Sequence, residues 1–128
     1  MQAPRMSKIV GIDLGTTHSA IAVVEAGMPG ILADAEGRRL LPSVVHFLAN
    51  GEPVVGVAAK RIQTVEPERT VSSAKRLMGQ FENSLVKGEA ASPVEVSALI
   101  LKELRAQAEA ALGESVDRAV ITVPAYFN

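Results

Sequence analysis

The sequence has 128 residues and a net charge of −1, with 48% apolar and only 3% aromatic residues. This length predicts one domain, or part of one, around an aliphatic core. The near-neutral charge gives no electrostatic case for binding nucleic acid or an anionic membrane. The absence of cysteine excludes disulfides and thiolate metal sites, and it fits a reducing compartment.

The chain shows no targeting or membrane segment. No apolar run approaches the roughly 20 residues of a transmembrane helix, and the N-terminus lacks the apolar region of a signal peptide. We therefore expect a soluble, cytoplasmic protein. Met6 begins a second start-like sequence, so residues 1–7 are expected to be a frayed extension.

The first predicted element is a hairpin of two apolar strands, residues 9–13 and 19–25. A glycine at its tip allows a tight turn at positive φ. Backbone amides bind anions and a carboxylate holds a cation or its waters, so this tip suits a phosphate beside a metal ion. The residues that carry this chemistry are Asp13, Gly15, Thr16 and Thr17.

The middle of the chain alternates short strands with turns. In order we expect a third strand, a polar loop, a strand opened by Pro42, a tight turn, its returning strand and a short helix. These lie at residues 30–32, 35–39, 43–48, 50–51, 54–55 and 56–63. Helical spacing predicts another short helix over residues 70–78, and the polar residues 80–91 predict a loop.

The strongest helix signal covers residues 92–113. Ser92 can cap the helix, with Pro93 in its first turn and Glu95 at the capping-box position, and Gly113 ends it. One apolar face is expected to pack on the core, through Val96, Ile100, Leu104 and Ala108.

Residues 118–123 form an unbroken apolar strand that ends at Pro124. The absence of alternation predicts a strand covered on both faces, as in a parallel sheet. The helical crossover before it favours a parallel neighbour. We therefore expect an α/β fold with a mixed sheet, whose first strands are antiparallel and whose last strand is parallel.

Five segments then carry a resemblance. Residues 11–17 read Gly-Ile-Asp-Leu-Gly-Thr-Thr, and residues 74–79 read Ala-Lys-Arg-Leu-Met-Gly. The others lie at residues 35–45, 55–61 and 119–128, the last ending Val-Pro-Ala-Tyr-Phe-Asn. Together, and in this order, they resemble the Hsp70 family of DnaK-like chaperones, whereas the first segment alone is shared with the wider actin and sugar-kinase superfamily.

The resemblance implies an actin-like ATPase fold (ribonuclease H-like), in which ATP lies between two lobes and its hydrolysis controls peptide binding in a separate domain. Residues 8–128 would be the first part of lobe I of the nucleotide-binding domain. Residues 34–92 would be its outer subdomain, trimmed because the stretch from residue 78 to 92 is shorter than in typical members.

The resemblance also implies roles for individual residues. One acid lies near Mg²⁺ and its waters, a glycine and two threonines lie near the phosphates, and a lysine acts at the γ-phosphate. A proline couples nucleotide state to the peptide-binding domain, although ending the strand is an equally good reason for it. In this sequence these are Asp13, Gly15, Thr16, Thr17, Lys75 and Pro124. The implied cofactors are ATP or ADP, Mg²⁺ and K⁺.

The 128 residues lack the family's second phosphate loop, adenine pocket and second lobe. We therefore expect that this chain alone does not hydrolyse ATP, and that client peptides and co-chaperones bind through parts outside it. Two alternatives are a piece of another actin-like phosphotransferase, such as a sugar kinase, and a degenerate, non-catalytic module that self-associates. His18 is expected in an exposed loop, and His46 is assigned no role.

Overall fold

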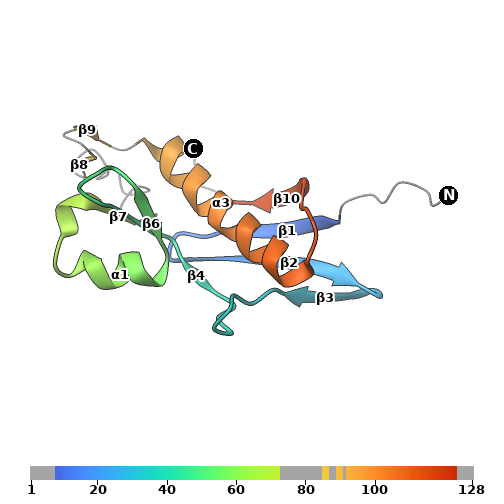
Figure 1. The fold of residues 1–128 in the computed structure, drawn as a ribbon. Helices are drawn as coiled ribbons and strands as arrows, with labels where there is room; N and C mark the ends of the chain where they lie inside the picture. The colour runs from blue at the N-terminus through green and yellow to red at the C-terminus, as the bar shows by residue number, and fades with distance from the viewer. Residues whose placement is uncertain (1–7, 73–84, 87–88, 91, 124–128) are drawn as a thin grey trace.

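The computed structural model describes residues 8–72, 85–86, 89–90 and 92–123. Figure 1 shows a long helix, α3 (Pro93–Leu112), lying across a main sheet, with the short helix α1 (Val57–Gln63) and a smaller sheet at one end. The main sheet has the order β10-β1-β2-β3, with β4 pairing with β2. Its strands are β1 (Ile9–Leu14), β2 (His18–Glu25), β3 (Met28–Ile31), β4 (Leu41–Pro42) and β10 (Arg118–Thr122).

The main sheet is mixed, as predicted. β1 pairs in parallel with β10, whereas β2 is antiparallel to β1, β3 and β4. The parallel pair requires a long crossover between its strands, and α3 is the final part of that connection. This arrangement confirms the α/β class and the parallel neighbour expected for the last strand.

Helix α3 begins and ends where its sequence predicts. The Ser92 hydroxyl accepts a hydrogen bond from the Glu95 backbone N–H at 3.1 Å, and Gly113 has left-handed backbone geometry with φ of 71°. The predicted apolar face is fully buried and packs with residues of β1 and β2: Val96, Ile100, Leu104, Ala108, Val10, Ile12, Leu14 and Ile21. In the described part of the chain, no helix is long and apolar enough to cross a membrane.

Strand β10 departs from its prediction. All five of its residues are exposed, and Val120 and Ile121 keep 64% and 45% of their surfaces accessible. The expectation that both faces are covered is therefore wrong for the described structure. The buried core cluster is formed by residues of β1, β2, β5, β7 and α3 and by Val116, and none of its residues belongs to β10, which lies at the edge of the described sheet.

The smaller sheet has the order β6-β5-β7, formed by β5 (Val44–Phe47), β6 (Pro53–Val55) and β7 (Thr70–Ser72). The predicted turn at residues 50–51 and the helix that follows β6 are confirmed. The helix predicted over residues 70–78 is wrong at its start, because Thr70–Ser72 pairs with β5 after a 3-10 turn at Pro67–Arg69. Thr70 and Val71 are β-branched and fully buried, which favours a strand. Residues 73–78 lie outside the described residues.

The loop predicted over residues 80–91 contains two short strands, β8 (Leu85–Val86) and β9 (Glu89–Ala90), which pair antiparallel. The prediction is therefore wrong for these four residues. Two residues separate the strands in the sequence, and the second is Gly88, which is a hairpin signal.

Candidate functional site

The tip of the β1–β2 hairpin brings the predicted phosphate-binding residues together. Ile12 and Leu14 point into the core and are 6% and 3% exposed. Strand alternation therefore turns Asp13, which lies between them, onto the opposite, exposed face. The apolar core thus fixes the direction of the carboxylate through the strand pleat.

Asp13 has a neighbour from the other end of the chain. The parallel register of β1 and β10 places Thr122 beside Asp13, and the Thr122 hydroxyl lies 3.2 Å from the carboxylate Oδ1. The same hydroxyl lies 3.4 Å from the backbone oxygen of Ile12. Because both strands are parallel, their carboxyl ends meet at one edge of the sheet, where open α/β sheets bind ligands.

The donor set at this edge fits Mg²⁺ held mainly by water and phosphate. Within the described residues no three His, Asp or Glu side chains gather as a metal-binding group. Mg²⁺ is usually bound by one or two carboxylates together with waters and substrate phosphates, rather than by an all-protein cage. One exposed carboxylate, Asp13, suits that mode of binding.

Gly15 is required for a reason other than the predicted one. Gly15 is absent from the residues with positive φ, so its backbone does not need the left-handed region. A Cβ at this position would instead lie 2.3 Å from the backbone oxygen of His18. The glycine therefore permits the close approach of the two strands at the hairpin tip.

Thr16 and Thr17 form the turn itself, between the end of β1 and the start of β2. Thr16 is half-buried and Thr17 is exposed. His18 is exposed as predicted, but it begins β2 rather than lying in a loop. The two threonines therefore lie at the tip, close in sequence to Asp13, and phosphate binding by their amides and hydroxyls stays a prediction.

Sequence reasoning missed two residues that support this turn. Ser43 lies between β4 and β5, and its hydroxyl donates to the Gly15 carbonyl at 2.9 Å. The Ser19 hydroxyl lies 2.8 Å from that of Ser43. The available signal was a serine directly after Pro42, but nothing local indicated that it would contact a hairpin tip 28 residues away.

Lys75 and Pro124 lie outside the described residues, so their predicted roles stay predictions. His46, to which the sequence assigned no role, is buried and 1% exposed. Its Nδ1 lies 3.0 Å from the Thr70 hydroxyl, and its Nε2 lies 3.4 Å from a carboxylate oxygen of Glu66. This cluster belongs to the smaller sheet and does not line the hairpin tip.

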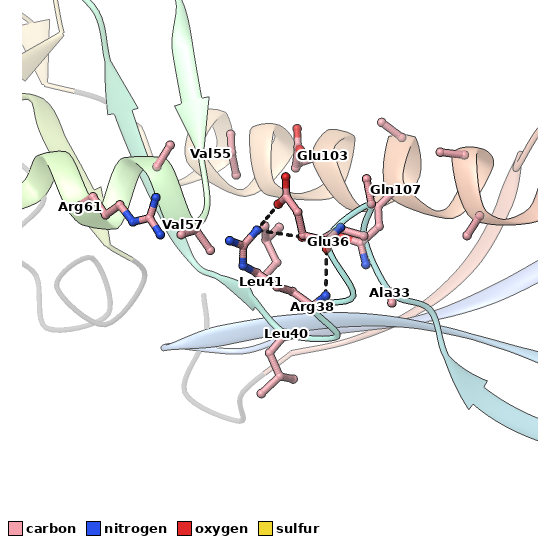
Figure 2. A pocket seen from close by; sticks show the side chains of 16 residues that line it. Ala33, Glu36, Arg38, Leu40, Leu41, Val55, Val57, Arg61, Glu103 and Gln107 are labelled. Atoms are coloured by element: carbon pink, nitrogen blue, oxygen red, sulfur yellow. Dashed lines mark hydrogen bonds and ion pairs between the residues drawn. The ribbon is translucent and has the colours of Figure 1, made fainter.

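A groove of about 720 Å³ lies elsewhere, between the loop at residues 33–41, α1 and one side of α3 (Figure 2). Arg38 pairs there with Glu36 and Asp34. The backbone N–H of Arg38 donates to the Asp34 carboxylate at 2.9 Å and holds the pKa of that carboxyl below its ordinary value. None of the groove residues belongs to the hairpin tip, so the cavity and the predicted chemistry are at different places.

The model of the Hsp70 protein family matches residues 9–91 and 80–128. The two matches overlap at residues 80–91, within the stretch where the resemblance predicts a shortened segment. The mixed α/β sheet crossed by a long helix is consistent with a trimmed lobe of the actin-like ATPase fold of that family. The chain belongs to the Hsp70 family.

Proposed function

We propose that the hairpin tip is the phosphate- and magnesium-binding wall of an ATP site in a DnaK-like chaperone. In that protein, cleavage of ATP to ADP and phosphate controls the binding of unfolded client peptides. The observation that carries the proposal is the exposed carboxylate of Asp13, two residues before the turn that begins at Gly15, at the carboxyl edge of a parallel strand pair. Membership of the Hsp70 family supports ATP as the nucleotide.

Each residue of the tip has one task in this proposal. Asp13 holds the waters of the cation, and the amides and hydroxyls of Thr16 and Thr17 bind the phosphate oxygens. An Mg²⁺ ion held there would supply positive charge to neutralise the phosphates, and K⁺ is the proposed second cation. Lys75 stabilises the charge that develops on the transferred phosphoryl group. Pro124 transmits nucleotide state to the peptide-binding domain.

We further propose that residues 8–128 form the first part of lobe I, with residues 34–92 as the outer subdomain. The protein would act in the cytoplasm, in protein folding and the response to stress, with co-chaperones bound by other parts. The 128 residues alone would not hydrolyse ATP, because phosphoryl transfer requires the nucleotide to be positioned from more than one side.

Calorimetric titration of the chain with Mg²⁺–ADP tests the site. Asp13→Asn is expected to weaken binding by about tenfold or more, because it removes a charged ligand. Asp117→Asn is the matched control, since it makes the same charge change at an exposed acid paired with Arg105 on α3. Equal affinities of the Asp13→Asn variant and the wild type would contradict the proposal.

A second proposal concerns the face of the main sheet opposite α3. Ile9, Val24 and Val120 are 53%, 64% and 64% exposed, and they lie around a shallow hollow of about 610 Å³ on that face. Exposed apolar surface of this kind favours association. We propose that the isolated chain self-associates through this face.

A further inference from the structure

Two buried hydroxyl groups meet beneath the hairpin tip. Ser19 and Ser43 are 1% and 0% exposed, and their hydroxyl oxygens lie 2.8 Å apart although the residues are 24 positions apart in sequence. Ser19 belongs to β2, and Ser43 lies at the corner where the chain leaves β4 in the main sheet for β5 in the smaller one. The pair therefore links β2 of the main sheet to the start of the smaller sheet, next to the hairpin tip.

Ser43 makes two hydrogen bonds to the turn. Its hydroxyl donates to the carbonyl oxygen of Gly15 at 2.9 Å, and its backbone N–H donates to the carbonyl oxygen of Thr17 at 2.9 Å. Ser43 thus binds the carbonyl groups of the two residues that flank Thr16 in the sequence, Gly15 and Thr17. Rotation of either peptide unit at the tip would break one of these bonds.

These bonds set the direction of the amide that the proposed phosphate needs. The Gly15 carbonyl and the Thr16 N–H belong to one planar, trans peptide unit, so they point in opposite directions. Because Ser43 draws the carbonyl inward, the Thr16 N–H is aimed away from Ser43 and the buried corner. The donor is therefore fixed before any anion arrives.

The number of hydroxyl hydrogens determines which serine donates in the Ser19–Ser43 contact. A hydroxyl has one hydrogen to donate, and that of Ser43 is used on Gly15. In the contact between the serines, the Ser19 hydroxyl is therefore the donor and Ser43 the acceptor. The chain runs from Ser19 through Ser43 to Gly15, and such chains strengthen their members cooperatively.

We propose that Ser43 is a positioning residue of the phosphate site, which holds the turn at residues 15–17 in its anion-binding geometry, and that Ser19 acts through Ser43. This inference rests on the proposed function for its ligand. It also makes a claim about the chain without ligand, namely that the turn is ordered by Ser43.

The test compares three variants by NMR of the full 128-residue chain. Ser43→Ala removes the hydroxyl that bonds Gly15, Ser19→Ala removes only the donor to Ser43, and Ser43→Thr keeps the hydroxyl. Thr70→Val is the matched control, because it removes a fully buried hydroxyl from the smaller sheet, away from the tip. Backbone ¹⁵N relaxation measures the order of residues 15–17, and shifts of the Thr16 and Thr17 amides report Mg²⁺–ADP binding.

We expect Ser43→Ala to lower the order of residues 15–17 and to weaken Mg²⁺–ADP binding about tenfold, the effect of one buried hydrogen bond. Ser19→Ala should weaken it by about threefold or less, because the bond to Gly15 remains. Ser43→Thr should restore both order and affinity. Thr70→Val should lower stability alone. Ser43→Cys, a near-isosteric variant with a weak donor, replaces Ser43→Ala if that variant does not fold.

Unchanged order and affinity in Ser43→Ala would overturn the inference, as would an equal loss in Thr70→Val. If the wild type shows no amide shifts with Mg²⁺–ADP, the proposed function fails for this chain. The relaxation data then decide the role of Ser43 separately, because they need no ligand.

Discussion

At the scale of single residues, the hairpin tip depends on Gly15 having no side chain. A side chain there would collide with the backbone oxygen of His18, which no rotamer change can relieve because the obstacle is main chain. The nearby Gly11 differs, since a Cβ added there would have no atom within 4 Å. Substitution of Gly15 therefore tests the close approach at the tip, and the same substitution of Gly11 is its control.

Gly15→Ala is expected to destabilise the chain by about 1–3 kcal/mol, the usual cost of forcing extra atoms into a closely packed place. Gly11→Ala should change the free energy of unfolding by less than about 0.5 kcal/mol, which is typical of surface substitutions. Urea denaturation followed by circular dichroism measures both. Similar stability of the two variants would show that the strands can separate at the tip without cost.

Asp34 gives a prediction about pH. Its carboxylate accepts the backbone N–H groups of Arg38 and Glu36, and the first of these is the main cause of its lowered pKa. The ordinary pKa is 3.8, so the stabilising contribution is present above pH 3.8 and is lost as the pH falls through the lower, folded value. The carboxyl ¹³C shift should therefore titrate with a midpoint below 3.8.

Arg38→Ala is a useful control for Asp34, because it keeps the backbone N–H that is the largest single cause of the lowered pKa. The midpoint in this variant should remain below 3.8. A midpoint at or above 3.8 in the wild type would mean that the turn at residues 34–38 does not form in solution.

At the scale of secondary structure, the smaller sheet is held by a buried polar cluster. The Thr70 hydroxyl lies 3.0 Å from Nδ1 of His46 and also donates to the Glu66 backbone oxygen at 2.9 Å. His46 and Thr70 are opposite each other in the register of β5 and β7. Because this hydroxyl already donates to Glu66, it is available to His46 as an acceptor for Nδ1–H.

Thr70→Val keeps the shape of the side chain but removes its hydroxyl. It should cost about 1–3 kcal/mol, since it leaves the buried Nδ1–H of His46 without this acceptor. Thr64→Val is the matched control, because the Thr64 hydroxyl donates to Arg61 at an exposed helix end. Thermal unfolding that is equally affected by the two variants would contradict the cluster's role.

An element could be predicted from the sequence when the interactions that form it join residues close together in the chain. Ser92 and Gly113 act within one helical turn, so the ends of α3 can be read from the sequence. The strand at Thr70–Ser72 forms because it pairs with β5, where Val71 lies opposite Val45. These two residues are 26 positions apart, so no local sequence pattern indicates the pairing. The contact of Ser43 with Gly15 is equally non-local. At the site, the motif therefore identified Asp13 and the turn, but not their support.

At the scale of the whole molecule, one face of the main sheet packs on α3 and the other is open among the described residues. If a second copy covers the open face, light scattering after size-exclusion chromatography should give twice the monomer mass at high concentration. Val120→Lys should return the chain to a monomer, because it places a charge on that face. A wild-type chain that stays monomeric would contradict the proposal.

The chain should also show no steady-state ATP hydrolysis, although its tip carries the residues proposed to bind phosphate. The described residues form one side of the proposed site, and positioning from that side alone leaves the γ-phosphate unconstrained. Phosphate release measured with Mg²⁺–ATP tests this. Turnover that depends on Mg²⁺ and disappears in Asp13→Asn would refute it, whereas turnover that persists in Asp13→Asn indicates a contaminating enzyme.

The nucleotide phosphates are expected to bind at the β1–β2 tip and not in the groove of Figure 2. Mapping of amide shifts in the ¹⁵N-labelled chain during titration with Mg²⁺–ADP separates the two places in one experiment. We predict shifts concentrated at Asp13, at residues 15–18 and at Thr122. Shifts confined to the groove, at residues 33–38 and Gln107, or none at the tip, would contradict the account.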